Sequence, residues 1–247
     1  PPIKGDVEFK NVTFSYEDGV EILKKVSFKA KKGQTVAIVG PTGAGKTTIV
    51  NLLSRFYNVD SGEVLIDGID ISKVTIRSLR KQMGVMMQDS FIFSGTVMDN
   101  IRYGNKEVSD EQVIRAAKTV CAHDFIMEME NGYYTQINER GSRLSQGQRQ
   151  LISFARALLA DPKILILDEA TSSIDTETEI LLQKGLNELL KGRTSFIIAH
   201  RLSTIKNADF IMYIDAGGIA EMGSHEELIS QKGEYYKLYM SQYDFLK

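Results

Sequence analysis

The sequence predicts an α/β fold built on a largely parallel β-sheet, and two kinds of strand pattern support this prediction. Short runs of β-branched residues and leucine, apolar on both faces, are typical of buried parallel strands and occur at 35–39, 163–167, 195–199 and 210–214. Helical patterns separate these runs, at Gln148 to Ala160 and at Thr176 to Leu190. Two earlier segments, 7–14 and 62–67, alternate apolar and polar residues, which predicts half-exposed antiparallel strands beside the main sheet.

The middle of the chain has a different character. Between about Ser72 and Ala160 strand signals largely disappear and helical patterns dominate. We therefore predict an α-helical subdomain, at about 88–160, inserted into an α/β core with an antiparallel β subdomain, at about 1–87 and 161–247. Asp161-Pro162 should end the long helix, because proline lacks an N–H and disfavours helix in the preceding residue.

Bulk properties exclude several classes of protein. The 247 residues fit one subdivided domain, and the formal net charge of −2 argues against a nucleic-acid partner. A single cysteine, Cys121, excludes an internal disulfide framework. The sequence contains neither a signal peptide nor an apolar run long enough to cross a bilayer, so any membrane contact is expected to be indirect. The start at Pro1-Pro2 suggests a piece of a longer polypeptide.

The strongest local signal is the glycine-rich run at 40–47, which lies between the strand predicted at 35–39 and a helical segment. Glycines let backbone N–H groups close around phosphate oxygens, and the following helix N-terminus attracts negative charge. Lys46 would bridge the β- and γ-phosphates, and the Thr47 hydroxyl would bind Mg²⁺. A glycine-rich turn without a ligand is the alternative. The run predicts a P-loop NTPase (RecA-like) core, with nucleotide-binding residues Gly40, Pro41, Thr42, Gly43, Ala44, Gly45, Lys46, Thr47 and Thr48.

A second element is the apolar run 163–167, which is followed by Asp168 and Glu169. Carboxylates at the end of a buried parallel strand lie at the edge of the sheet where α/β proteins bind ligands. Asp168 would hold the magnesium ion, and Glu169 would act as general base toward the attacking water. By itself, such a pair is often only a solvated strand end.

The run Leu144-Ser145-Gln146-Gly147-Gln148 resembles the signature motif of ABC (ATP-binding cassette) proteins, whose usual form is Leu-Ser-Gly-Gly-Gln. In isolation this stretch would read as a plain capped helix, but the order of phosphate loop, signature and acidic strand matches the ABC family along essentially the whole chain. Ser145 at the helix N-cap, with Gly147 and Gln148, would form a second anion site.

The resemblance implies roles for further residues. Tyr16 stands where the family places an aromatic ring that stacks on adenine, and Gln88 matches the glutamine loop that senses Mg²⁺. Asp175 belongs to the loop that crosses the dimer interface, and His200 matches the switch histidine that contacts the γ-phosphate and orients Glu169. The implied cofactors are ATP and Mg²⁺, with the metal bound by Thr47, Gln88 and Asp168, and the catalytic group comprises Lys46, Glu169 and His200.

Other segments resemble the exporter branch of the family. Residues 91–97 and 139–141 are similar to exporter loops that dock on the coupling helices of transmembrane domains. This implies an ATPase motor at the cytoplasmic face of the cell (inner) membrane, as part of an integral membrane transporter. The alternatives are a chromosome-maintenance or DNA-repair ATPase, disfavoured by the short spacing between motifs, an ATP-binding module without hydrolysis, and an importer ATPase.

Gln146 departs from the family pattern, because it replaces the glycine expected in the middle of the signature. If that position needs a glycine backbone conformation, or room for the γ-phosphate, glutamine introduces strain or bulk. In ABC proteins each nucleotide lies between one chain's phosphate loop and the other chain's signature. We therefore predict a second nucleotide-binding domain as partner, from a non-identical half-transporter. An ordinary homodimer that tolerates Gln146 is the alternative.

Overall fold

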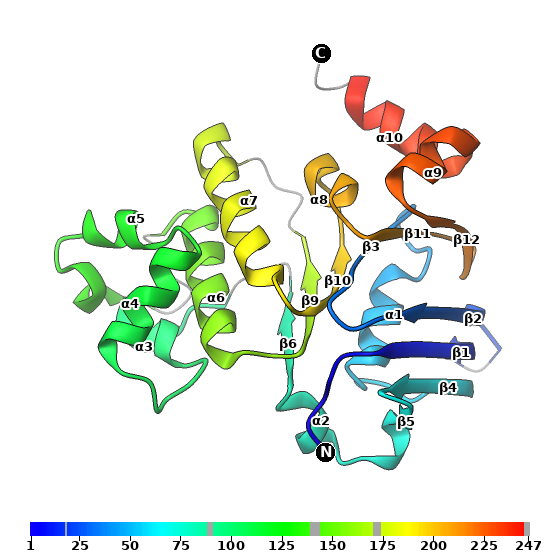
Figure 1. The fold of residues 1–247 in the computed structure, drawn as a ribbon, viewed down its shortest axis with the longest axis horizontal. Helices are drawn as coiled ribbons and strands as arrows, with labels where there is room; N and C mark the ends of the chain where they lie inside the picture. The colour runs from blue at the N-terminus through cyan, green and yellow to red at the C-terminus, as the bar shows by residue number, and fades with distance from the viewer. Residues whose placement is uncertain (18, 88–90, 139–143, 170–173, 245–247) are drawn as a thin grey trace. The chain divides into compact units, whose positions relative to one another are not determined.

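In a computed structural model, residues 1–17, 19–87, 91–138, 144–169 and 174–244 are described, and the chain forms two compact units (Figure 1). The core unit comprises Pro1–Val85, Lys163–Thr171 and Gly192–Lys247. The helical unit comprises Met86–Pro162 and Ser172–Lys191. The helical unit thus takes in Thr176–Leu190 in addition to the segment expected from the sequence.

The main sheet of the core unit has six strands in the order β12-β11-β3-β10-β9-β6. The strands β3, β9, β10 and β11 are parallel, as the apolar runs predicted, whereas β12 pairs with β11 in antiparallel fashion. In Figure 1, β9, β10 and β3 lie side by side, with their carboxyl ends at one edge of the sheet. The strands are β3 Thr35–Val39, β6 Met83–Met86, β9 Ile164–Asp168, β10 Thr194–Ile198, β11 Phe210–Asp215 and β12 Gly218–Gly223.

A second, antiparallel sheet has the order β2-β1-β4-β5. Its strands β1 and β4 are the two segments whose alternation predicted them, and their apolar side chains are buried in the core. The rings of Phe9 and Phe28 stack there with centroids 4.6 Å apart. The strands are β1 Val7–Ser15, β2 Glu21–Ala30, β4 Ser61–Ile66 and β5 Ile69–Asp70.

Strands β2 and β6 were not predicted from the sequence, for local reasons. In β2 the backbone of Lys25 has a φ of 51°, and the register with β1 shifts, so the buried residues Leu23 and Val26 lie three apart rather than two. Strand β6 is only four residues long and contains Gly84, which leaves no alternating pattern to read. After Ser72, where strand signals largely disappear from the sequence, the structure thus has β6 and also the short pair formed by β7 Gly95–Thr96 and β8 Gln136–Ile137.

Helices of the core unit flank its sheets: α1 Lys46–Leu53, η1 Ile71–Lys73, α2 Ile76–Arg80, α8 Leu202–Lys206, α9 His225–Gln231 and α10 Glu234–Asp244. Helix α1 begins directly at the end of the glycine-rich run and buries Ile49, Leu52 and Leu53. Among the described residues, no helix is both long enough and apolar enough to span a lipid bilayer.

The helical unit is organised around α6, which packs against α3, α4 and α7. Helix α6 buries Leu151, Ile152 and Phe154. It ends before Asp161-Pro162, as the sequence predicted, and Asp161 has a left-handed backbone at the C-cap. The helices are α3 Val97–Arg102, α4 Asp110–Thr119, α5 His123–Met127, η2 Gly132–Tyr134, α6 Gln146–Ala160 and α7 Thr176–Leu190.

Candidate functional site

The glycine-rich loop connects β3 to α1, and its three glycines have φ values of 138° at Gly40, 81° at Gly43 and 108° at Gly45. A Cβ at Gly40 would lie 2.1 Å from the carbonyl oxygen of Ile214, and one at Gly45 would lie 2.8 Å from a methyl of Leu23. A Cβ at Gly43 would meet no atom within 4 Å. Packing therefore requires Gly40 and Gly45, whereas Gly43 faces open space in which a ligand can approach the backbone.

Lys46, the first residue of α1, lies over this loop. Its ammonium group donates hydrogen bonds to the carbonyl oxygens of Gly40 at 2.8 Å and Pro41 at 2.7 Å. Burial lowers the pKa of Lys46, while the Asp168 carboxylate acts in the opposite direction. Burial raises the pKa of Asp168, opposed by His200 and Lys46. The loop lysine, the strand-end carboxylate and the histidine after β10 therefore share one electrostatic environment at the sheet edge.

The oxygen donors at this edge suit a hard divalent cation. The Thr47 residue is exposed and follows Lys46, and the Asp168 carboxylate is half-buried at the end of β9. Within the described ranges, no group of three or more His, Cys, Asp or Glu residues could by itself hold a metal ion. Magnesium in nucleotide sites typically uses one or two protein oxygens together with phosphate oxygens and water, so these residues fit Mg²⁺ rather than an all-protein metal cage.

Glu169 lies beside Asp168, but its carboxylate is turned into the protein and is only 4% exposed. One carboxylate oxygen accepts hydrogen bonds from the backbone N–H groups of His200, at 2.8 Å, and Arg201, at 2.9 Å. The other accepts from the Thr204 hydroxyl at 2.7 Å and lies 3.8 Å from the Arg201 guanidinium. The sequence analysis placed Glu169 and His200 together but missed Arg201 and Thr204, for which no motif existed.

Tyr16 is a partly exposed aromatic residue near the loop. Its residue is 46% exposed, and its hydroxyl lies 3.1 Å from the hydroxyl of Thr48 in α1. The ring packs edge-on against Phe14 and Tyr57, with centroid distances of 4.8 Å and 5.0 Å. Tyr57 is half-exposed in the same cluster and was also missed, because it lies in a segment without strand or helix periodicity.

The predicted signature residues lie in the helical unit, at the start of α6. The Ser145 side chain accepts a hydrogen bond from the Gln148 backbone N–H at 3.1 Å, and the Gln148 side chain accepts from the Ser145 N–H at 3.0 Å. This reciprocal capping box leaves the exposed Ser145 at the helix tip. A Cβ at Gly147 would lie 2.2 Å from a methyl carbon of Thr178, so close packing of α6 on α7 requires this glycine.

Gln146 is the first residue of α6, and it is not among the described residues with a positive φ. A glutamine therefore adopts this backbone without strain. Of the two consequences considered for the missing glycine, strain and bulk, the backbone leaves the bulk of the side chain.

The remaining predicted site residues fall in two places. Asp175 is the N-cap of α7, and its side chain accepts a hydrogen bond from the Thr178 N–H at 2.9 Å, which lowers the pKa of Asp175. Gln88, the loop at 139–141 and Ser172-Ser173 lie outside the described residues. The structure thus brings together Tyr16, residues 40–48, Asp168, Glu169 and His200 in the core unit, and Ser145, Gly147, Gln148 and Asp175 in the helical unit.

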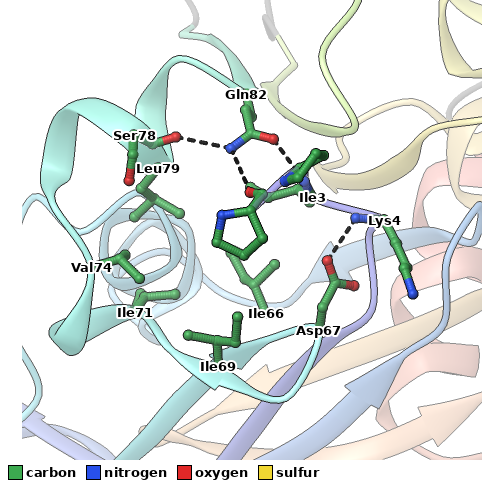
Figure 2. A pocket seen from close by; sticks show the side chains of 12 residues that line it. Ile3, Lys4, Ile66, Asp67, Ile69, Ile71, Val74, Ser78, Leu79 and Gln82 are labelled. Atoms are coloured by element: carbon green, nitrogen blue, oxygen red, sulfur yellow. Dashed lines mark hydrogen bonds between the residues drawn. The ribbon is translucent and has the colours of Figure 1, made fainter.

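A cavity of about 230 Å³ lies elsewhere in the core unit, between the N-terminal segment and the β4–α2 region (Figure 2). Its polar groups hold the chain rather than face a ligand: Asp67 accepts hydrogen bonds from the backbone N–H groups of Lys4, Gly5 and Asp6 at 2.6–3.0 Å. The Gln82 side chain likewise accepts from the N–H of Ile3 at 2.7 Å. The remaining lining is mostly aliphatic, contributed by Ile66, Ile69, Ile71, Val74 and Leu79.

Comparison with known proteins gives a consistent result. Residues 23–172 match the family described as ABC transporter. The chain is 55% identical over 240 residues to YfiC of Bacillus subtilis (strain 168), an uncharacterized ABC transporter ATP-binding protein, covering 97% of this chain and 40% of that protein. It is 49% identical over 238 residues to a fatty acid ABC transporter ATP-binding/permease protein of Mycobacterium bovis (strain ATCC BAA-935 / AF2122/97), covering 96% of this chain and 38% of the relative.

Among solved structures, the chain superimposes on a bacterial Atm1-family ABC exporter with ATP bound, with a TM-score of 0.90 and 44% sequence identity. The match covers 98% of this chain and 42% of the exporter chain. The predicted P-loop NTPase fold is confirmed by this likeness. The chain spans about two fifths of the length of the relatives it matches.

Proposed function

The chain belongs to the ABC transporter family, and from this premise we propose that it is the motor domain of an exporter. In this proposal the chain binds Mg·ATP, pairs with a second nucleotide-binding domain around it, and hydrolyses it to drive transport by attached transmembrane domains. The site of action is the cytoplasmic face of the cell membrane. The relatives named as ATP-binding/permease proteins and the likeness to an exporter structure support this assignment.

The observation that carries the proposal is the arrangement at the loop after β3. Gly43 leaves its backbone open to a ligand, and the Lys46 ammonium lies above the loop carbonyls within the electrostatic reach of Asp168. Backbone N–H groups, the N-terminus of α1 and one lysine together match a chain of phosphates. The half-exposed Tyr16 ring supplies a flat surface for adenine.

Each residue then has a defined task. Lys46 neutralises phosphate charge, Thr47 and Asp168 hold Mg²⁺, and His200 contacts the γ-phosphate. A bound Mg²⁺ supplies further charge neutralisation on the phosphate oxygens. Glu169 accepts a proton from the attacking water. Gln88, which the family resemblance includes in the metal site, belongs to the same proposal.

The second face of the nucleotide site is proposed to come from the partner domain. The tip of α6 carries an exposed Ser145, the positive end of the helix dipole and the Gln148 side chain. Asp175 caps the next helix, α7, with an exposed side chain. Loss of the γ-phosphate would remove the negative charge that joins the two domains, and the pair would reopen.

The lysine is the direct test of nucleotide binding. We expect Lys46→Ala to weaken binding of a fluorescent Mg·ATP analogue at least tenfold, because charge-assisted hydrogen bonds to phosphate contribute about 1.5–3 kcal/mol. Lys81→Ala, which removes an exposed lysine of the core unit, is the matched control and should bind as the unchanged chain does. A Lys46→Ala chain that is folded by circular dichroism and binds with unchanged affinity would contradict the proposal.

The proposed contact with coupling helices rests on an exposed aromatic cluster in the helical unit, formed by Phe91, Phe93 and Tyr103. Phe91 and Tyr103 are 53% and 54% exposed, and the rings of Phe93 and Tyr103 lie 4.4 Å apart. Arg156 of α6 braces the cluster, since its guanidinium donates to the Phe91 carbonyl at 2.9 Å and lies 5.1 Å from the Phe93 ring. A firmly held apolar surface of this kind suits a helix of the membrane part.

The non-identical partner is a separate proposal, and it rests on the bulk of the Gln146 side chain at the start of α6. If glutamine obstructs the partner's γ-phosphate, Glu169→Gln with Mg·ATP stays monomeric, whereas Gln146→Gly/Glu169→Gln dimerises at least tenfold more tightly. Sedimentation velocity over a concentration series measures both. The chain with Glu169→Gln but without nucleotide is the control. A stable Glu169→Gln homodimer with Mg·ATP would contradict the proposal of a non-identical partner and support an ordinary homodimer.

A further inference from the structure

Three hydrogen bonds occupy most of the lone pairs of the Glu169 carboxylate in the orientation it adopts. One oxygen already accepts two backbone N–H groups, from His200 at 2.8 Å and Arg201 at 2.9 Å. The other accepts the Thr204 hydroxyl at 2.7 Å, beside the Arg201 guanidinium at 3.8 Å. A general base must lie about 2.6–3.2 Å from the proton that it removes, with a free lone pair facing it.

The burial of Glu169 also separates its carboxylate from an attacking water. Glu169 is 4% exposed and Thr204 is 3% exposed, so their contact excludes water from the carboxylate. The neighbouring Asp168, by contrast, is half-buried, and His200 is exposed. The groups proposed to meet phosphate and metal therefore face the ligand, whereas the proposed base is turned away from it. An attacking water can reach Glu169 only after these contacts are broken.

We infer that Thr204 is a positioning residue that holds Glu169 in a withdrawn orientation, and that its release is a step in each catalytic turnover. This inference rests on the proposed function, in which Glu169 is the base. The two N–H donors belong to residues 200–201, which directly follow the sheet edge, and Thr204 lies one turn further on in α8. A shift of the segment at His200 toward a γ-phosphate would therefore loosen the same contacts that restrain Glu169.

Thr204→Val tests the inference, because valine keeps the shape of threonine and carries a methyl group in place of the hydroxyl. A hydrogen bond to a charged group stabilises a conformation enough to change its population tenfold or more. We therefore expect Thr204→Val to raise the kcat of basal ATP hydrolysis about three- to tenfold, with the KM for ATP changed less than twofold. Thr204→Ser, which retains the hydroxyl, should restore the rate of the unchanged chain. A purely structural role would lower stability without raising kcat.

Two further measurements keep the test decisive. Glu169→Gln/Thr204→Val should show no gain over Glu169→Gln, since the effect must act through the carboxylate. Hydrogen exchange of the His200 and Arg201 amides, whose acceptor is Glu169, should be faster in Thr204→Val without nucleotide, and this holds even if turnover is too slow to measure. Should Thr204→Val not fold, Thr204→Ala is measured in the same way.

The outcomes separate the inference from the proposed function. Unchanged or lower kcat with unchanged amide exchange in a folded Thr204→Val chain overturns the inference and leaves Glu169 as base untouched. Equal turnover by the unchanged chain and Glu169→Gln overturns the proposed role of Glu169 itself. A gain in kcat that persists in the double variant also overturns the inference, because the effect would then not pass through Glu169.

Discussion

Replacing Glu169 by glutamine is expected to lower ATP turnover at least a hundredfold while leaving Mg·ATP binding within about threefold. General-base catalysis contributes about 10²–10⁴-fold, and an amide cannot accept the proton from water. Glutamine has the same shape as glutamate, so the buried contacts around this position are largely kept. The measurement is phosphate release under saturating Mg·ATP, paired with direct titration of a fluorescent nucleotide.

Glu63→Gln is the matched control for this variant, because it makes the same chemical change at an exposed position of β4 in the same unit. It should hydrolyse ATP at the rate of the unchanged chain. A Glu169→Gln chain that turns over at the control rate would show that another group activates the water. Loss of both hydrolysis and binding would instead mean that the substitution disturbs the loop.

Replacing Gly40 by alanine is expected to lower the free energy of unfolding by more than about 3 kcal/mol. The new methyl would lie 2.1 Å from the carbonyl oxygen of Ile214, which belongs to the neighbouring strand β11 and cannot move independently of the sheet. The φ of 138° at this position adds strain for any residue with a Cβ. Urea unfolding followed by circular dichroism measures the change.

Gly43→Ala provides the matched control within the same loop. Its φ of 81° carries a cost of about 1–2 kcal/mol for alanine, but no atom lies within 4 Å of the new methyl. This variant should therefore lose only about 1–2 kcal/mol of stability, less than Gly40→Ala loses, while the methyl weakens nucleotide binding by occupying the open side of the loop. Equal loss of stability in the two variants would contradict the argument from packing.

Much of the fold could be predicted because the hydrophobic pattern of each strand reflects how many of its faces are buried. The apolar runs became β3, β9, β10 and β11 with boundaries shifted by at most one residue, since strands buried on both faces need continuous apolar sequence. Strand β2 was missed because the positive φ of Lys25 breaks its period. Strand β6 was missed because four residues carry no periodicity.

The candidate site also contains residues that the sequence predicted and residues that it did not. The glycine-rich loop singled out Lys46, the end of an apolar strand singled out Asp168, and the family resemblance added His200. The structure places the three in one electrostatic environment. For Gln146 the sequence left strain and bulk as two possible consequences of the missing glycine. The backbone decides against strain, because φ is not positive there and the first turn of α6 accepts any ordinary residue. The sequence also gave no sign of Tyr57 beside Tyr16, since the two are brought together only by folding.

The amino-acid pattern was enough to predict the alternation of strands and helices, the glycine-rich loop and the family. Each of these depends on residues adjacent in the chain, and local backbone preference and burial pattern are encoded at that range. The inward orientation of Glu169, toward His200, Arg201 and Thr204, became visible in the folded chain. The direction of a buried carboxylate depends on donors more than thirty residues away, which no local pattern specifies.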